Sequence, residues 1–255
     1  MNSGKVYLVG AGPGDPKLIT VRGLECIKAA DVIIYDRLAN PSLLEYAHAH
    51  AEFIYCGKLP KHHTLKQEQI NDLLVAKAQE GKVVTRLKGG DPCVFGRVGE
   101  EAEVLARCDI PYEIVPGVSS GIAAPAYAGI PVTHRDFGSS FAMVTGHLQH
   151  EENNEEKWKA LASGIDTVAF YMGVKNLPLI CTELIRHGKK ETTPVAIIEW
   201  GTTERQRTIV GTLQNIEKTA SEANISHPAI ILVGEIVSFR EKMQWFSEGG
   251  VGVSS

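Results

Sequence analysis

The sequence lacks several features that would place it in particular classes of protein. It has no apolar run near the roughly 20 residues of a membrane-spanning helix, and its first residues lack the apolar stretch of a signal peptide. Its five cysteines are an odd number and include no Cys-x-x-Cys pair. This spacing disfavours a disulfide framework. We therefore expect a cytoplasmic protein with reduced thiols and no membrane association.

The chain also has no excess of positive charge. It carries 26 Lys and Arg against 30 Asp and Glu, a net charge of -4. Surfaces that bind nucleic acid are normally basic, so we expect no nucleic-acid partner. The histidine pairs at 48/50 and 62/63 have no matching cysteine or carboxylate spacing, so we also expect no metal. With 255 residues, the chain can bury a core without a disulfide or a metal.

Short apolar runs alternate with helical patterns along the whole chain. The runs predict strands at residues 6–9, 32–35, 53–55, 83–87, 112–115, 141–145, 167–172, 195–200, 206–210 and 229–233. Helices are predicted at 100–106, 118–127, 154–162, 176–186, from about 212, and up to Gln79 after a capping box formed by Thr64 and Gln67. Nearly continuous apolar strands between helices indicate an α/β protein with a mostly parallel sheet covered on both faces.

A polar stretch at residues 133–140 interrupts this alternation. We place a domain boundary near residues 134–140, which predicts an N-terminal α/β domain with glycine-rich loops at 1–136 and a C-terminal α/β domain at 137–242. The glycine-rich end at 243–255 is predicted to be a loose tail.

The first predicted strand ends in a glycine-rich loop, GAGPGDP at residues 10–16. It invites comparison with the dinucleotide fingerprint G-x-G-x-x-G, and Asp36 even stands where a ribose-binding acid would. However, Asp15 occupies the third glycine position and two prolines remove backbone donors. Without Gly-Lys-Ser/Thr it is not a P-loop either. Taken alone, the loop could be a structural turn.

Further loops of this kind follow other predicted strands. KGGDP at 88–92 suits a neutral or cationic ligand, because its acid and exposed carbonyls are acceptors. PGVSS at 116–120 precedes a helix that a serine could simply cap. Met172-Gly173 and Trp200-Gly201 end strands in the second half. Ligands of open α/β sheets bind at the carboxyl ends of strands, so this recurrence favours a binding site.

Taken in order, these motifs resemble those of the tetrapyrrole methylase family. The matching segments are VGAGPGDP (9–16), ADVIIYDRL (30–38), YCGK (55–58), RLKGGDPCVFGRVGEE (86–101), VPGVSSGIAAPAYAGIPVTHRD (115–136), FYMG (170–173) and HPAIILVG (227–234). The resemblance covers residues 5–241. The intact YDRL, YCGK and THRD elements favour the members that act on uroporphyrinogen III, and no synthase or dehydrogenase segment is evident, which suggests a stand-alone methyltransferase.

The resemblance implies a fold and a reaction. The expected fold is two α/β domains with a cleft between them, the class III methyltransferase type, usually as a homodimer. The cleft would hold S-adenosylmethionine in a folded shape. The implied reaction methylates C2 and then C7 of the tetrapyrrole substrate uroporphyrinogen III. It gives precorrin-2 through precorrin-1 for sirohaem or cobalamin, with S-adenosylhomocysteine as the second product.

Motif matching also implies site residues. The implied cofactor contacts are Pro13, Gly89, Gly90, Asp91, Val94, Ser119, Ser120, Met172, Gly201 and Ala229. Asp36 as proton acceptor and Lys58 as proton donor match the catalytic pair proposed for the family, and Arg37 is a rival in handling the proton. We favour Asp36, because an arginine base would need a very large depression of its pKa.

A substrate with eight carboxylates requires fixed cations. Arg37, Arg97 and Arg135 stand in family motifs and can bind carboxylates through bidentate forks. Glu100 would orient an arginine or face a pyrrole N–H.

Three alternatives remain open at this point. The chain could be another family member, acting on a later corrin precursor or a ribosomal RNA base. It could be a nicotinamide-dependent oxidoreductase that uses the first glycine loop, or a binding module that keeps the fold without catalysis. The missing basic excess disfavours RNA, and Asp15 disfavours a dinucleotide.

Overall fold

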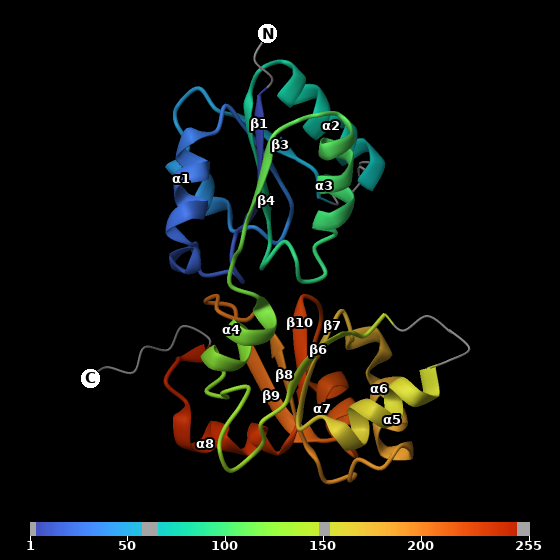
Figure 1. The fold of residues 1–255 in the computed structure, drawn as a ribbon. Coiled ribbons are helices and arrows are strands. Elements are labelled where there is room, and N and C mark those ends of the chain that lie inside the picture. The colour runs from blue at the N-terminus through green and yellow to red at the C-terminus, as the bar shows by residue number, and fades with distance from the viewer. Residues whose placement is uncertain (1–3, 58–65, 148–153, 249–255) are drawn as a thin grey trace. The chain divides into compact units, whose positions relative to one another are not determined.

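The computed structural model describes residues 4–57, 66–147 and 154–248. The chain divides into two compact units, residues 1–119 and residues 120–255 (Figure 1). Each unit has its own sheet and its own hydrophobic core.

The first unit is built on a parallel sheet. Within residues 4–57 and 66–119, five strands run in the order β3-β2-β4-β1-β5. Their bounds are Lys5–Gly10 (β1), Val32–Tyr35 (β2), Glu52–Tyr55 (β3), Val83–Lys88 (β4) and Tyr112–Val115 (β5). Every pairing is parallel, as the apolar runs predict. The carboxyl ends of all these strands therefore lie at one edge of the sheet.

Helices cover both faces of this sheet because neighbouring strand residues point in opposite directions. Ile33 packs with α1 (Val21–Ala29), whereas Val32 and Ile34 belong to the core under two other helices. These are α2 (Gln67–Gln79) and α3 (Val98–Arg107), which Figure 1 shows on the other side of the sheet from α1. Short 3-10 helices at Pro16–Leu18 (η1) and Pro41–Tyr46 (η2) complete the connections.

The start of α2 differs from the predicted capping box. Thr64 lies outside the described residues, and Gln67 is the first residue of the helix rather than a capping side chain. The side-chain oxygen of Gln69 instead accepts a 2.8 Å hydrogen bond from the backbone N–H of Lys66. Because the helix begins later than expected, the capping glutamine shifts with it to the third helical position.

The second unit has a mixed sheet. Within residues 120–147 and 154–248, five strands run in the order β6-β7-β10-β8-β9. They are Phe141–Thr145 (β6), Thr167–Tyr171 (β7), Pro194–Glu199 (β8), Arg207–Thr212 (β9) and Ala229–Val233 (β10). Among these described strands only β6 and β7 pair in parallel, which corrects the expected mostly parallel arrangement. The connection from β8 to β9 is too short for a parallel crossover, so the two strands form an antiparallel hairpin.

The two faces of this sheet are also covered differently. Phe170, Ile197 and Ile231 share a core with α5 (Asn154–Gly164), α6 (Leu177–Arg186) and α7 (Ile216–Glu222). On the other face α4 (Ser120–Tyr127) contacts β7 and β10, and η4 (Glu235–Phe239) contacts β8. The remaining short elements are η3 (Val174–Asn176) and α8 (Arg240–Met243).

The boundary between the units lies before α4, not near residues 134–140. The backbone N–H of Gly121 in α4 donates a 2.7 Å hydrogen bond to the hydroxyl of Tyr171 at the end of β7. Further along, the rings of His134 and Phe137 pack against Phe239. The polar stretch that suggests a linker is therefore a loop of the second unit, and α4 belongs to that unit as well.

The predicted tail is packed as far as the structure describes it. The indole N–H of Trp245 donates to the carbonyl of Ala126 at 2.9 Å, and the Trp245 ring meets Tyr127 edge-on. The carboxylate of Glu248 accepts a 2.9 Å hydrogen bond from the backbone N–H of Thr208. Residues up to Glu248 thus belong to the second unit, which corrects the predicted tail boundary at 243.

Helix α6 offers a matched test of the core of the second unit. Leu184 is fully buried beneath the sheet, whereas Leu179 on the same helix is 41% exposed. We expect Leu184→Ala to lower the free energy of unfolding by about 2–5 kcal/mol, because it removes buried methyl groups and leaves a cavity. Leu179→Ala should change it by less than about 0.5 kcal/mol. Urea unfolding followed by circular dichroism measures both, and equal losses would contradict this packing.

Candidate active site

Three strand-end loops meet at the carboxyl edge of the first sheet. Beyond β1 and β4, Gly12 and Gly90 form an antiparallel bridge in which each N–H donates to the other's carbonyl, at 3.2 and 2.7 Å. The loop after β5 joins them, because Gly117 donates its N–H to Oδ2 of Asp91 at 2.9 Å. The sheet thus continues past its strands as a tied cluster of loops.

The cluster requires glycine where its backbones touch. A Cβ on Gly10 would lie 2.6 Å from the Cα of Gly117, and a Cβ on Gly117 would lie 2.4 Å from the carbonyl oxygen of Gly90. Both distances are below any normal contact to rigid backbone. Gly12 and Gly90 also have φ of 78° and 72°, a left-handed conformation that glycine adopts without strain.

Two backbone donors of the first loop are already engaged. Ala11 donates to the carbonyl of Lys88 at 2.7 Å, and Gly12 donates to Gly90. The carboxylate of Asp15 accepts from the backbone N–H of Lys17. A dinucleotide fingerprint needs free N–H groups aimed at a pyrophosphate. The N–H groups of Ala11 and Gly12 instead hold the segment at the end of β4, which argues against the oxidoreductase alternative.

Asp36 stands at the end of β2, on the same edge. Its Oδ1 accepts a 2.9 Å hydrogen bond from the backbone N–H of Leu38, and its Oδ2 lies 3.5 Å from Nη2 of Arg86. Its side chain keeps 27% exposure, so a ligand can reach it. The adjacent Arg37 is exposed. Lys58, the predicted proton donor, lies outside the described residues.

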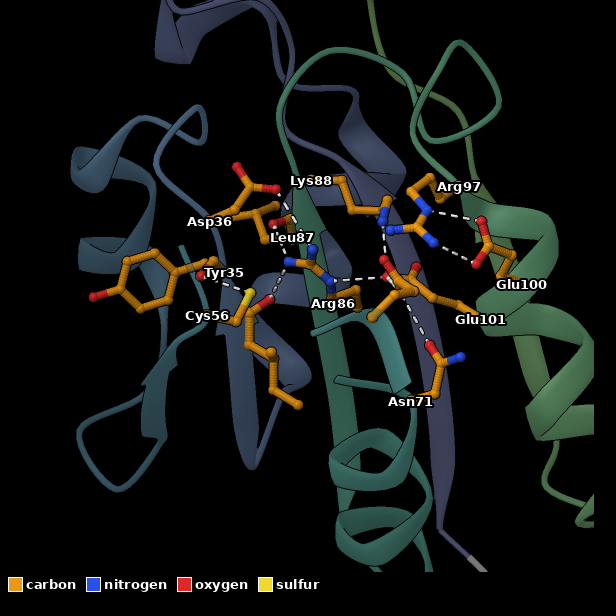
Figure 2. A network of polar contacts seen from close by, with 12 residues as sticks. Tyr35, Asp36, Cys56, Asn71, Arg86, Leu87, Lys88, Arg97, Glu100 and Glu101 are labelled. Atoms are coloured by element: carbon orange, nitrogen blue, oxygen red, sulfur yellow. Dashed lines mark hydrogen bonds and ion pairs between the residues drawn. The ribbon is translucent and has the colours of Figure 1, made fainter. Parts of the chain in front are cut away.

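Behind Asp36 lies a buried polar network that motif matching does not assign (Figure 2). Glu101 in α3 is fully buried, and its Oε1 lies 3.2 Å from Nε of Arg86 and 2.8 Å from Nζ of Lys88. Both cations are 4% exposed and belong to β4. Two cations in a short and otherwise mostly apolar strand are the sequence feature that could have predicted this network, because buried charges need partners.

Burial and ion pairing shift the pKa values of these two cations in opposite directions. Burial lowers the pKa of Lys88, and the neighbouring Arg86 lowers it further. Burial alone would lower the pKa of Arg86, but the charges of Glu101 and Asp36 contribute to a net rise. Arg86 therefore stays charged and can pair with both carboxylates.

The predicted cofactor residues of the first unit lie in these loops. Gly89, Gly90, Asp91 and Val94 follow β4, Pro13 follows β1, and the buried Ser119 follows β5. Asp91 ties two loops together, because its two carboxylate oxygens accept hydrogen bonds from the backbone N–H groups of Cys93 and Gly117.

Arg97 and Glu100 form an exposed pair near the start of α3. Two hydrogen bonds of 2.7 and 2.6 Å join the guanidinium of Arg97 to the carboxylate of Glu100. The hydrogen bonds from Arg97 hold the pKa of Glu100 below its usual value. This pairing agrees with the first of the two roles considered for Glu100, which stays a prediction.

The predicted residues of the second unit gather at strand ends of their own sheet. Ser120 begins α4, and Gly201 lies against that helix, since a Cβ on Gly201 would be 2.4 Å from the Cβ of Ala124. Ala229 begins β10 and pairs with the last residue of β8. Met172 after β7 is 51% exposed, so it is not a core residue. The exposed Arg135 lies in a different loop of this unit.

Strained backbone marks the same loops. Met172, Trp200 and Thr202 have φ of 55°, 49° and 69°. Positive φ is uncommon for such residues and concentrates at ligand sites.

Metal-ligand clusters and membrane-spanning helices are both absent from the described part of the chain. No group of three His, Cys, Asp or Glu side chains there could hold a metal ion. Among the described residues, no helix is long and apolar enough to cross a membrane.

Comparison with known proteins identifies the family. The profile of the Tetrapyrrole (Corrin/Porphyrin) Methylases matches residues 5–217. With the two α/β units and the strand-end loops, this match shows that the chain belongs to that family, and the predicted class III methyltransferase fold is confirmed. A uroporphyrinogen-III C-methyltransferase of Priestia megaterium is 61% identical over 92% of this chain and 99% of its own.

Two solved structures and a second curated relative extend this comparison. A uroporphyrin-III C-methyl transferase from Thermus thermophilus, complexed with S-adenyl homocysteine, has a TM-score of 0.78 and 37% identity over 92% of this chain and 99% of its own. A cobalt precorrin-4 methyltransferase has a TM-score of 0.82 and 29% identity over 91% and 95%. The siroheme synthase of Pseudomonas putida is 49% identical over 95% of this chain but only 52% of its own length.

The loop cluster can be tested by adding one methyl group. We expect Gly117→Ala to lower the free energy of unfolding by about 1–3 kcal/mol, because its Cβ would meet backbone of two other loops. Gly99→Ala is the matched control, since nothing lies within 4 Å of a Cβ there and the residue is helical. It should raise stability by up to about 1 kcal/mol. Thermal and urea unfolding compare the two, and a stable Gly117→Ala variant would rule out the tight contact.

Proposed function

We propose that this chain transfers methyl groups from S-adenosylmethionine to carbon atoms of uroporphyrinogen III. The observation that carries the proposal is the edge of the first sheet, where the reachable carboxylate of Asp36 follows β2 and the loops after β1, β4 and β5 are tied together by hydrogen bonds. The high identity to proteins named uroporphyrinogen-III C-methyltransferase supports the choice of substrate.

The donor groups at the strand ends suit S-adenosylmethionine better than a phosphate ligand. In the first unit the N–H groups of Ala11, Gly12 and Gly90 are engaged within the protein, which favours a cofactor with amine donors and a sulfonium over a phosphate ligand. Gly89, Gly90 and Pro13 would hold it there. In the second unit the strained loops around Met172 and Gly201 would provide further contacts. When bound, the cofactor supplies an electrophilic methyl group.

The chain's own task is then to orient the substrate and accept a proton. When a pyrrole carbon takes the methyl group from the sulfonium, the alkylated ring system becomes cationic and must lose a proton from another of its atoms, which requires a base within reach. Asp36 fits this role, because its carboxylate is exposed on one side and held by Leu38 and Arg86 on the other. Lys58 is retained as the proposed proton donor.

Substrate carboxylates would meet the arginines at the site. Arg97 is already oriented by Glu100, and Arg37 lies beside the proposed base. Arg135 in the second unit is a third candidate. Charge-assisted bidentate bonds of this kind are stronger than neutral ones and fix orientation.

The finer points belong to the same proposal. Methylation proceeds at C2 and then C7, through precorrin-1 to precorrin-2, in a cytoplasmic homodimer. The similarity to siroheme synthases supports a product that enters sirohaem biosynthesis. Size-exclusion chromatography with light scattering tests the dimer, and NMR of the product tests the two positions.

Incubation with S-adenosylmethionine and enzymatically made uroporphyrinogen III tests the activity. A red-fluorescent dimethylated product after oxidation is expected, and its absence would overturn the proposal. Asp36→Asn should lower kcat by about 100- to 10,000-fold, because it removes the proposed base. Asp109→Asn is the matched control, since Asp109 precedes β5 and so lies at the opposite edge of the sheet. An equal effect of both variants would exclude Asp36 as the base.

Arg97 should matter for the substrate and not for the cofactor. We expect Arg97→Ala to weaken binding of uroporphyrinogen III by about tenfold or more, the value of a charge-assisted hydrogen bond. The affinity for S-adenosylmethionine should stay unchanged. Arg107→Ala, at the far end of α3, should affect neither. Isothermal titration calorimetry compares the wild type with both variants, and the reverse pattern for Arg97→Ala would contradict this role.

A further inference from the structure

We propose that Arg86 is a positioning residue for Asp36 and that the buried carboxylate of Glu101 fixes Arg86 in place. The inference rests on the proposed function of Asp36 as the proton acceptor. It adds residues from β4 and α3 that touch neither substrate nor cofactor, yet determine where the reacting carboxylate points.

The guanidinium of Arg86 is held on every side. Its Nε faces Oε1 of Glu101 at 3.2 Å, and its Nη1 donates to the carbonyls of Ile34 and Leu87 at 3.3 and 3.2 Å. The remaining nitrogen, Nη2, lies 3.5 Å from Oδ2 of Asp36. Figure 2 shows these contacts converging on one side chain. Arg86 therefore links the half-buried carboxylate of Asp36 to the core.

Glu101 provides the anchor at the other end. It is fully buried, and its Oε1 also faces Nζ of Lys88 at 2.8 Å and the side-chain amide of Gln67 at 3.3 Å. Its Oε2 is buried and has no hydrogen-bond partner among the described residues. One oxygen of this carboxylate thus pairs with two cations, Arg86 and Lys88. Asp36, Arg86, Lys88 and Glu101 together carry no net charge, which makes the buried arrangement tolerable.

The geometry of the guanidinium is what positions Asp36. Oδ1 of Asp36 accepts the backbone N–H of Leu38, and Oδ2 lies 3.5 Å from the guanidinium of Arg86, so both oxygens have a partner in the first unit. A planar fork can pair with Asp36 and Glu101 at once, whereas the point charge of a lysine cannot span both. Arg86→Lys should therefore keep the charge and lose the orientation.

A double-mutant cycle tests this coupling. The single-turnover rate of methylation is measured for the wild type, Arg86→Lys, Asp36→Asn and the double variant, with calorimetry for both ligands. Arg86→Lys should lower the rate by about 10- to 100-fold, as expected for a misplaced reacting group, with binding affinities unchanged. In the Asp36→Asn background, the same substitution should cause no further loss.

Arg22→Lys is the matched control. Arg22 is an exposed arginine of the same unit that pairs with Glu113, so its replacement should leave the rate unchanged. Because Arg86 is buried, its replacement could lower stability, so the thermal unfolding of each variant is measured beside its rate. If Arg86→Lys does not fold, Glu101→Gln replaces it in the cycle. That variant removes the anchoring charge while keeping the shape, and it should give the same non-additive pattern.

The outcomes separate this inference from the function beneath it. Additive losses in the cycle, or weakened cofactor binding together with lost stability, would show a merely structural role and overturn the inference. An active wild type whose rate is insensitive to Arg86→Lys would overturn it as well. A wild type without methylation overturns the proposed function, and the inference falls with it.

Discussion

The backbone pairing of β1 with β4 determines the layout of the first unit. Gly10 lies opposite Lys88 at the end of this pairing, and the Gly12–Gly90 bridge continues it beyond the strands. Because all the strands are parallel, every loop that follows one emerges at this edge. The glycines permit close approach, and Asp91 ties in the loop after β5. The candidate site is therefore a consequence of strand direction combined with small residues.

Charge inside the first unit follows from the same arrangement. Strand β4 is central, so its residues are buried on both faces, and the cations Arg86 and Lys88 must find partners within the protein. Helix α3 supplies Glu101, and the end of β2 supplies Asp36. Because the buried cations need partners, the interior of the sheet is connected to the edge that holds the candidate site.

The second unit also carries its candidate site residues in loops at strand ends. Its sheet is mixed, and its strand-end loops combine residues at positive φ with a close approach of Gly146 to Gly173. Met172 is exposed, and Gly201 lies against α4. Strained, exposed residues cost stability, and proteins retain them mainly where they serve a ligand.

Much of this protein could be predicted from its sequence. Apolar runs located the strands of both sheets to within a residue or two at each end, and the ordered motifs led to the family. The sequence could not reveal the direction of β10 or the unit to which α4 belongs, because both depend on contacts between distant segments such as Gly121 and Tyr171. The motif is what makes Asp36 the proposed base. Its link to Arg86 and Glu101 was decided only by the tertiary structure, since burial forces charges far apart in the chain to pair.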